Sequence, residues 1–288
     1  YIPFATQNAN AYSGRFGLPN DLYERFHFGT TKTKYATFDQ KRDDFVEGWT
    51  PNVYAPCFKE SAVDDLASSL KKILSTAMGQ EENFLEKLTY RAAPMMKANF
   101  YPACKKMSKD QPRLAEHTDV VPMTIMLQDD TKNGLEAQNV HGRWLFVNPP
   151  KNALFVMTGD CTEILTNGHY RAAPHKVPYP ENVEFSKMEC RISLPYFVQM
   201  NKNDKLKPLA KFLKINSTEK FKSTTYQDIM HKKMKNLVDT VLMTKINASI
   251  KPYKPKTSAK IRIKIRPTNN QRCWAVPRTP ALPAMPIA

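Results

Sequence analysis

Apolar and polar positions follow two different patterns along this chain, and the change between them comes near residue 95. From Ser61 to Gly79 apolar residues recur every three or four positions, which predicts an amphipathic helix that Ser61 caps and Gly79 ends. A second, shorter helix is expected over Glu81–Leu88. Residues 1–57 show no clean period and are expected to form irregular segments with short helices.

Beyond residue 95 the chain breaks into short runs with a period of two, separated by glycine, proline and asparagine. Several short strands at close spacing are typical of an antiparallel sandwich or jelly roll. The fold class expected is therefore mainly β with flanking helices, and a single helical turn falls over Cys161–Leu165. The predicted strands are Met95–Tyr101, Pro122–Gln128, Leu135–Val140, Arg143–Val147, Ala153–Thr158, His175–Tyr179 and Arg191–Met200.

The C-terminal third changes character twice. Thr225–Met243 has helical spacing, with lysines on its polar side, and is expected to pack on the outside of the β-core. Residues 246–288 contain seven prolines, nine Lys/Arg and no Asp or Glu, which predicts a disordered tail, with Ile261–Ile265 as an alternative short edge strand. Four parts follow: a helical and irregular part (1–93), a β-core (94–200), a helical segment (201–245) and a basic tail (246–288).

Charge and cysteines limit the classes of function. The net charge of +16 comes from 43 Lys and Arg against 27 Asp and Glu, and nine of the basic residues lie in the tail. Charge runs without interleaved aromatic residues are usually solvated, so binding to nucleic acid is disfavoured. No run approaches the roughly 20 apolar residues of a membrane helix. The five cysteines show no metal-site spacing, which indicates free thiols in a cytoplasmic protein.

The candidate chemistry centres on His117 and Asp119. Side chains two positions apart on an extended segment point the same way, so the imidazole and the carboxylate share a face. His175, at the start of a later predicted strand, supplies a second imidazole. Two histidines and one carboxylate on one face of an octahedron suit non-haem Fe(II) and its reaction with O₂. Arg191, two positions before Ser193, is suited to anchor a carboxylate because its planar fork bonds both oxygens.

Other histidines compete for the third ligand position. His169 lies in the turn that follows Asn167-Gly168, where an imidazole is more often solvated than bound to metal, so His175 is preferred. His27, His141 and His231 fall in irregular or helical contexts and are interpreted as exposed structural residues.

Around these residues the sequence resembles the 2-oxoglutarate/Fe(II)-dependent dioxygenase superfamily, in the branch of isopenicillin N synthase and plant oxygenases. The resemblance is specific over about residues 94–200. The motifs that carry it, in order, are Asn99–Cys104, His117–Val120, Leu127–Asp130, Gly142–Trp144, Gly159–Asp160, Leu165–Tyr170, Ala173–Val177 and Arg191–Pro195.

Membership of this family implies a distorted double-stranded β-helix, which is a jelly roll. It implies an iron site formed by His117, Asp119 and His175. It also implies contacts to 2-oxoglutarate from Arg191, Ser193, Tyr101 and Asn99, and a substrate contact from Phe197.

The activity implied is oxidation of a small, possibly acidic molecule by O₂, as hydroxylation, desaturation or oxidative cyclisation, with release of succinate and CO₂. Fe(II) and 2-oxoglutarate are the expected cofactor and co-substrate, ascorbate is a candidate reductant, and a monomer is expected. Arg-x-Ser also occurs in family members that do not use 2-oxoglutarate, so an oxidase of that kind remains an alternative. A third alternative is an inactive barrel whose basic tail binds polyanions.

Two features depart from the family pattern. His175 and Arg191 lie 16 positions apart, farther than in plant relatives, which predicts a longer loop around Pro178–Glu189. The family usually has strands and helices before the point where Tyr1 falls, so the chain is expected to be a piece of a longer protein.

Overall fold

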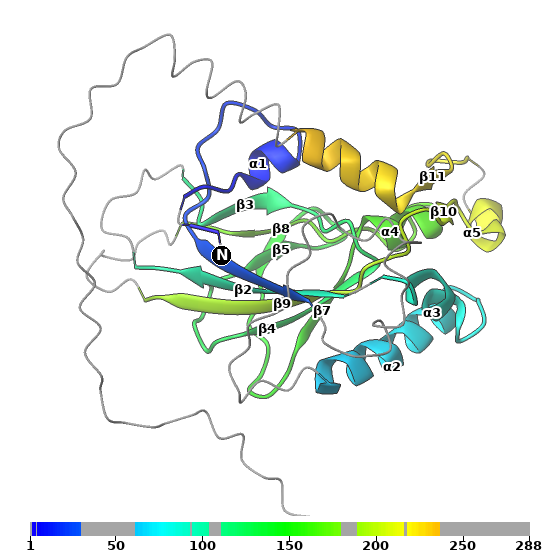
Figure 1. The fold of residues 1–288 in the computed structure, drawn as a ribbon, viewed down its shortest axis with the longest axis horizontal. Coiled ribbons are helices and arrows are strands. Elements are labelled where there is room, and N and C mark those ends of the chain that lie inside the picture. The colour runs from blue at the N-terminus through cyan, green and yellow to red at the C-terminus, as the bar shows by residue number, and fades with distance from the viewer. Residues whose placement is uncertain are drawn as a thin grey trace, which may run out of the picture.

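A computed structural model describes residues 2–3, 5–29, 61–92, 94–103, 111–179, 189–215 and 218–236 (Figure 1). The basic tail at 246–288, its alternative strand and the end of the predicted 225–243 helix lie outside these residues. So do most of the longer loop before Arg191 and the thiols of Cys57, Cys104 and Cys273.

Two antiparallel sheets face each other and form the body of the molecule (Figure 1). The larger sheet has the order β1 (Glu24–Gly29), β2 (Met95–Tyr101), β9 (Arg191–Phe197), β4 (Met123–Gln128), β7 (Phe155–Thr158). The smaller sheet has the order β3 (Leu114–His117), β8 (His175–Val177), β5 (Glu136–Gln138), β6 (Trp144–Phe146). From β2 to β9 the chain passes repeatedly between the two sheets. This confirms the predicted jelly-roll core.

Helices cover the larger sheet on the side away from the smaller one. Helix α2 (Ser61–Ala77) and helix α3 (Phe84–Thr89) pack with buried Met96, Ile125 and Tyr196, which point outward from β2, β4 and β9. The Tyr196 hydroxyl also donates a hydrogen bond to Asp64 Oδ1 at 2.5 Å, which ties the sheet to α2. The helix predicted over Ser61–Gly79 is confirmed as α2, and its apolar side faces the larger sheet.

A second apolar cluster lies between the sheets. It contains Tyr101, Met126 and Met157 from the larger sheet, Tyr23 from the residue just before β1, and Leu114, Ala115 and Val177 from the smaller sheet. Because the two sheets do not meet along their whole length, this cluster fills only part of the space between them. The remaining space is the cavity described below.

Several elements were not predicted from the sequence. They are α1 (Ala9–Tyr12), β1, β3, β10 (Lys205–Leu206), α5 (Ala210–Ile215) and β11 (Thr224–Thr225). The expectation of irregular chain with short helices over residues 1–57 fits α1 but misses β1. Strand β1 pairs along its full length with β2, so the N-terminal segment is part of the larger sheet rather than a separate unit.

The described part of the predicted C-terminal helix spans residues 226–236, next to α1 in Figure 1. Its Tyr226, Met230 and Met234 line the space between the sheets. The helix therefore covers the opening of the barrel, whereas the sequence suggested that it would lie on the outside of the core. Within the described residues, no helix is long and apolar enough to cross a membrane.

Candidate metal centre and its cavity

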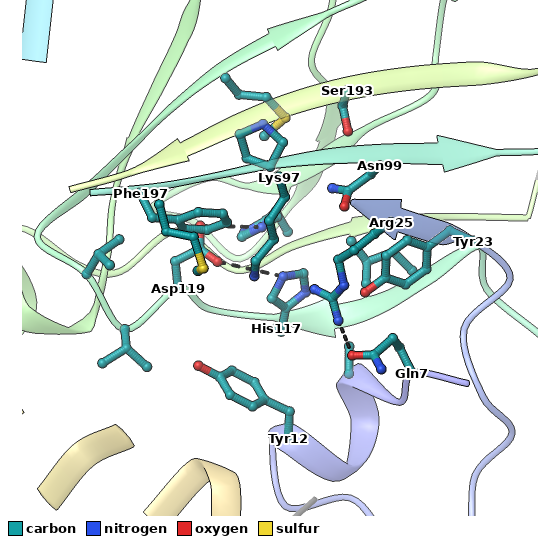
Figure 2. Close-up of a pocket in the computed structure, with 18 of the residues that line it drawn as sticks. Gln7, Tyr12, Tyr23, Arg25, Lys97, Asn99, His117, Asp119, Ser193 and Phe197 are labelled. Carbon is teal, nitrogen blue, oxygen red and sulfur yellow. Dashed lines mark hydrogen bonds and ion pairs between the residues drawn. The ribbon is translucent and has the colours of Figure 1, made fainter. Parts of the chain in front are cut away.

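A cavity of about 500 Å³ opens between the two sheets (Figure 2). This volume falls in the range of pockets that hold small molecules. Its wall carries the cations Arg25, Lys97 and Arg191, whereas Asp119 is the one carboxylate among the described residues that line it. The cavity is thus a cationic site with one acidic group.

The structure brings His117, Asp119 and His175 together at this cavity. One potential ligand atom from each residue lies within 4.8 Å of the others. His117 Nε2 is 3.8 Å from Asp119 Oδ1, and His175 Nε2 is 3.9 Å from Asp119 Oδ2. Sequence reasoning placed these three side chains on one face, and they lie on one face here.

Strand pairing explains how residues 58 positions apart meet. His117 ends β3 and pairs directly with His175, the first residue of β8, so both imidazoles leave the smaller sheet side by side. Asp119 follows in the loop to β4. That loop packs tightly against Gly159, where a Cβ atom would lie 2.2 Å from Val121 O and 2.5 Å from Asp119 O. A residue with a side chain at position 159 would displace the loop.

Hydrogen bonds orient all three side chains. His117 Nδ1 lies 2.9 Å from Ala115 O and His175 Nδ1 lies 3.0 Å from Ala173 O. A carbonyl can only accept, so each Nδ1 carries the proton and each Nε2 is left with a free lone pair. Thr124 Oγ1 donates to Asp119 Oδ2 at 2.6 Å and orients the carboxylate.

Protonation in the site favours metal binding. Burial, with a further contribution from His175, lowers the pKa of His117 to about 3, so this imidazole is neutral at pH 7. Burial opposes ionisation of Asp119, but the two imidazoles and the Thr124 hydroxyl outweigh it, so the pKa of this carboxyl lies below its usual value. Neutral imidazole and ionised carboxylate are the forms that bind metals.

The donor set fits a divalent transition metal. Two imidazole nitrogens and one carboxylate provide three ligands on one side, and the cavity leaves the other side free for exogenous ligands. This combination, with open positions, is diagnostic of non-haem Fe(II) sites, whereas structural zinc sites are closed by four protein ligands.

The far end of the cavity is suited to bind a carboxylate. The Arg191 side chain is 1% exposed, and its Nη2 donates to Gln128 Oε1 at 2.9 Å. Its Nε and Nη1 are buried and have no hydrogen-bond partner among the described residues. Unsatisfied buried donors are rare and point to a ligand. A Cβ atom at Gly134 would lie 2.6 Å from Arg191 Cδ, so this glycine leaves room for the arginine.

Register places the other predicted co-substrate residues beside Arg191. Tyr101 is its cross-strand partner, and Asn99 is the partner of Ser193 on the same two strands. Because side chains alternate along a strand, all four face the cavity. The Arg191 guanidinium lies 5.1 Å from the centre of the Tyr101 ring. Asn99 Oδ1 is also buried without a partner among the described residues.

Comparison with known proteins matches this arrangement. Residues 92–200, which contain every residue of the metal cluster and of the carboxylate end, match the model of the 2OG-Fe(II) oxygenase superfamily. The core of the chain, residues 92–200, is therefore that of a 2OG-Fe(II) oxygenase superfamily member.

Relatives place this superfamily member near plant enzymes. Flavanone 3-dioxygenase 2 of Oryza sativa subsp. japonica is 29% identical over 194 residues, which cover 65% of this chain and 54% of that protein. Scopoletin 8-hydroxylase of Arabidopsis thaliana is 29% identical over 182 residues, or 61% and 48% of the two chains. The chain therefore spans about half the length of these curated relatives.

Solved structures of superfamily members share the fold. A 2OG-Fe(II) oxygenase family protein from Caulobacter crescentus superposes with a TM-score of 0.63 at 22% identity, covering 82% of this chain and 75% of that one. JOX2, solved in complex with 2OG, Fe and JA, superposes with a TM-score of 0.57 at 21% identity, covering 74% and 60%. At this identity the likeness supports the jelly-roll fold.

The structure also places the remaining predicted site residues. Phe197 lines the cavity, as the superfamily resemblance implies. His169 is exposed and packs near Tyr170 and Phe212, with ring centres 5.1 and 5.4 Å away, so it is not part of the metal cluster. His27 is exposed, as expected, but it lies on strand β1 rather than in irregular chain, and it also lines the cavity.

Sequence reasoning missed Arg25 and Lys97 as cavity residues. Arg25 and His27 alternate along β1, and they pair with Asn99 and Lys97 on β2. Figure 2 shows Arg25 and Lys97 pointing toward His117. Burial, with a further contribution from Arg25, lowers the pKa of the Lys97 amine to about 7. The signal that could have found them is the alternation of polar residues, Arg25 and His27, within an N-terminal segment that shows no clean apolar period.

Proposed function

We propose that this chain is an Fe(II)- and 2-oxoglutarate-dependent oxygenase that oxidises a small organic molecule and releases succinate and CO₂. One observation carries the proposal: the cluster of His117, Asp119 and His175 shares a cavity with a buried arginine, Arg191, two of whose nitrogens have no hydrogen-bond partner among the described residues. One group of residues suits a redox metal and the other suits an anionic co-substrate.

In this proposal His117, Asp119 and His175 hold Fe(II). When bound, the iron supplies open coordination positions for a chelating 2-oxo acid and for O₂, and the oxidative chemistry is its own. Arg191 binds the distal carboxylate of 2-oxoglutarate through its guanidinium, whose Nε and Nη1 have no hydrogen-bond partner among the described residues.

The remaining residues position the reactants. Ser193, Tyr101 and Asn99 lie next to Arg191 on the two paired strands and are placed to hydrogen-bond the co-substrate. Phe197 lies farther along the same face of β9 and is placed to contact the substrate. Met230 and Met234 of the 226–236 helix cover the opening and help to exclude water from the site.

A second candidate function is an oxidase of the isopenicillin N synthase type, which does not consume 2-oxoglutarate. The observation in its favour is that Arg191 requires only a carboxylate, which a substrate can also provide. The two functions differ in one measurable respect, since only the oxygenase makes succinate.

The substrate class, oligomeric state, location and reductant belong to the same proposal. We infer a free small molecule as substrate, a monomeric protein and a cytoplasmic location, with ascorbate as reductant. Among the described residues both cysteines are free thiols, Cys161 buried and Cys190 exposed, which supports a reducing compartment.

The test combines metal binding with turnover. Anaerobic titration with Fe(II) is expected to show one binding site per chain, and addition of 2-oxoglutarate and O₂ is expected to produce succinate. His175→Ala is expected to abolish both signals, whereas the matched change His141→Ala, in an exposed turn, is expected to alter neither. Wild-type levels of succinate from the His175→Ala protein would rule out the assignment.

A further inference from the structure

Two cations of the cavity wall have no role in the proposed handling of iron and 2-oxoglutarate. Arg25 and Lys97 belong to neighbouring strands, and both side chains face the cavity. Arg25 pairs with Asn99, so Lys97 is its diagonal neighbour on the same face of the sheet. Diagonal neighbours lie roughly 7–8 Å apart, a spacing at which two long side chains can contact one ligand. Figure 2 shows both of them on the His117 side of the cavity.

No carboxylate of the described residues neutralises either cation. Among the described residues, no carboxylate lies within 4.0 Å of the charged nitrogens of Arg25 or Lys97. Arg25 Nη2 donates to the neutral Gln7 Oε1, and the guanidinium lies 5.1 Å from the centre of the Tyr23 ring. Arg25 Nε is buried, and none of the described residues offers it a hydrogen-bond partner. The Lys97 amine lies 4.3 Å from the centre of the Phe197 ring.

The charges of a loaded site do not balance without a further anion. Fe(II) and Arg191 together would offset Asp119 and the two carboxylates of 2-oxoglutarate. The charge of Arg25 remains, together with that of Lys97 whenever its amine is protonated. Unpaired charges in a partly desolvated cavity are unfavourable, and a bound anion relieves them.

We propose that Arg25 and Lys97 form an anion subsite that receives a carboxylate of the organic substrate, so that the oxidised molecule is an organic acid. This inference rests on the proposed function, because it treats the ligand as the substrate of that site. The subsite lies on β1 and β2, on the His117 side, and Asn99 separates it from Ser193 and Arg191 on β9.

The surroundings of the subsite define the rest of the ligand. Side chains that are apolar or aromatic line the cavity next to it: Tyr12, Val121, Phe197, Met230 and Met234. Such a wall suits a hydrophobic or aromatic skeleton. The substrate class that fits is therefore an amphipathic acid with one carboxylate and an apolar body, held so that the body lies toward the metal ligands.

The test measures whether the site distinguishes an acid from its neutral ester. The anaerobic protein, loaded with Fe(II) and 2-oxoglutarate, is titrated calorimetrically with cinnamate, 3-phenylpropanoate and 1-naphthylacetate, and with the methyl ester of each. We expect at least one acid to bind about 10-fold or more tighter than its ester, as charge-assisted contacts predict. The variants Arg25→Gln and Lys97→Met are expected to lose this preference, and Lys97→Arg is expected to keep it.

Exposed residues of the same kinds provide matched controls. Arg143→Gln and Lys151→Met lie at the surface and are expected to leave the acid preference unchanged. Equal behaviour of every acid and its ester in the wild-type protein, including binding of neither, would overturn the proposal. So would an acid preference that survives in both Arg25→Gln and Lys97→Met.

The outcome also separates this inference from the proposed function. Acid preference without any succinate production would leave the anion subsite in place and remove the oxygenase assignment. Succinate production without acid preference would support the oxygenase assignment and remove the anion subsite.

Discussion

Replacement of Arg191 by glutamine tests the role of the most buried cation in the cavity. Arg191 is 1% exposed, and two nitrogens of its guanidinium, Nε and Nη1, meet no hydrogen-bond partner in the part of the chain that the structure describes. Charge-assisted hydrogen bonds contribute about 1.5–3 kcal/mol each, so two of them amount to about 3–6 kcal/mol of co-substrate binding. At about 1.4 kcal/mol per factor of ten, Arg191→Gln is expected to raise the KM for 2-oxoglutarate at least ~100-fold.

The assay follows succinate, or the equivalent shortened acid, with two co-substrates. One is 2-oxoglutarate, and the other is 2-oxopentanoate, which keeps the chelating 2-oxo acid group but lacks the distal carboxylate. The wild-type protein is expected to prefer 2-oxoglutarate by about the same ~100-fold factor, because only that molecule pairs with Arg191. Arg191→Gln is expected to use the two acids almost equally.

Thermal unfolding separates lost binding from lost folding. The substitution removes a buried charge with two unpaired donors, whose desolvation is unfavourable in the empty site. The ligand-free variant is therefore expected to unfold within a few degrees of wild type, but to lose the stabilisation by 2-oxoglutarate. Arg143→Gln, in an exposed turn, is the matched control. A variant that folds and keeps the wild-type preference for 2-oxoglutarate would refute the role of Arg191.

Three further changes test other contacts. Thr124→Val removes the hydroxyl that orients Asp119 and is expected to weaken Fe(II) binding by about 10-fold to 100-fold in an anaerobic titration. Asp21 is fully buried and accepts hydrogen bonds from the backbone N–H groups of Ala9 and Ala115, which Asp21→Ala removes. Urea unfolding is expected to show a free energy of unfolding about 2–5 kcal/mol lower than wild type. Asp21→Asn is expected to cause a smaller loss. Because the pKa of Lys97 is about 7, its amine is charged below that pH and neutral above it. Calorimetry is therefore expected to show weaker binding of an acid ligand at pH 8 than at pH 6. Lys97→Arg is expected to remove this pH dependence.

The core of the fold and the metal cluster were predictable because their sequence signals are local. Strand β2 has the predicted bounds, Met95–Tyr101, and β9 begins at the predicted Arg191. The His-x-Asp spacing predicted two ligands on one face, and the loop that carries Asp119, packed against Gly159, holds it beside His117. The third ligand needed the fold, since only the pairing of β3 with β8 brings His175 to His117 rather than His169.

Strand β1 was missed because its pattern is the reverse of the usual one. The β1 residues that line the cavity, half-buried Arg25 and exposed His27, are polar, whereas the apolar Phe26 between them does not line it and is 38% exposed. A strand that lines a polar cavity buries charge, so a search for an apolar inner face does not find it. Strand β3 was missed for another reason, since its four residues are too few to show a period.

The most direct test of the central claim is the ratio of succinate formed to O₂ consumed by the Fe(II)-loaded protein. An oxygen electrode records uptake with and without 2-oxoglutarate, and chromatography measures succinate in the same samples. The proposed oxygenase predicts that uptake requires 2-oxoglutarate and that about one succinate forms for each O₂. O₂ uptake that proceeds equally well when 2-oxoglutarate is omitted would contradict it. So would O₂ uptake that forms no succinate.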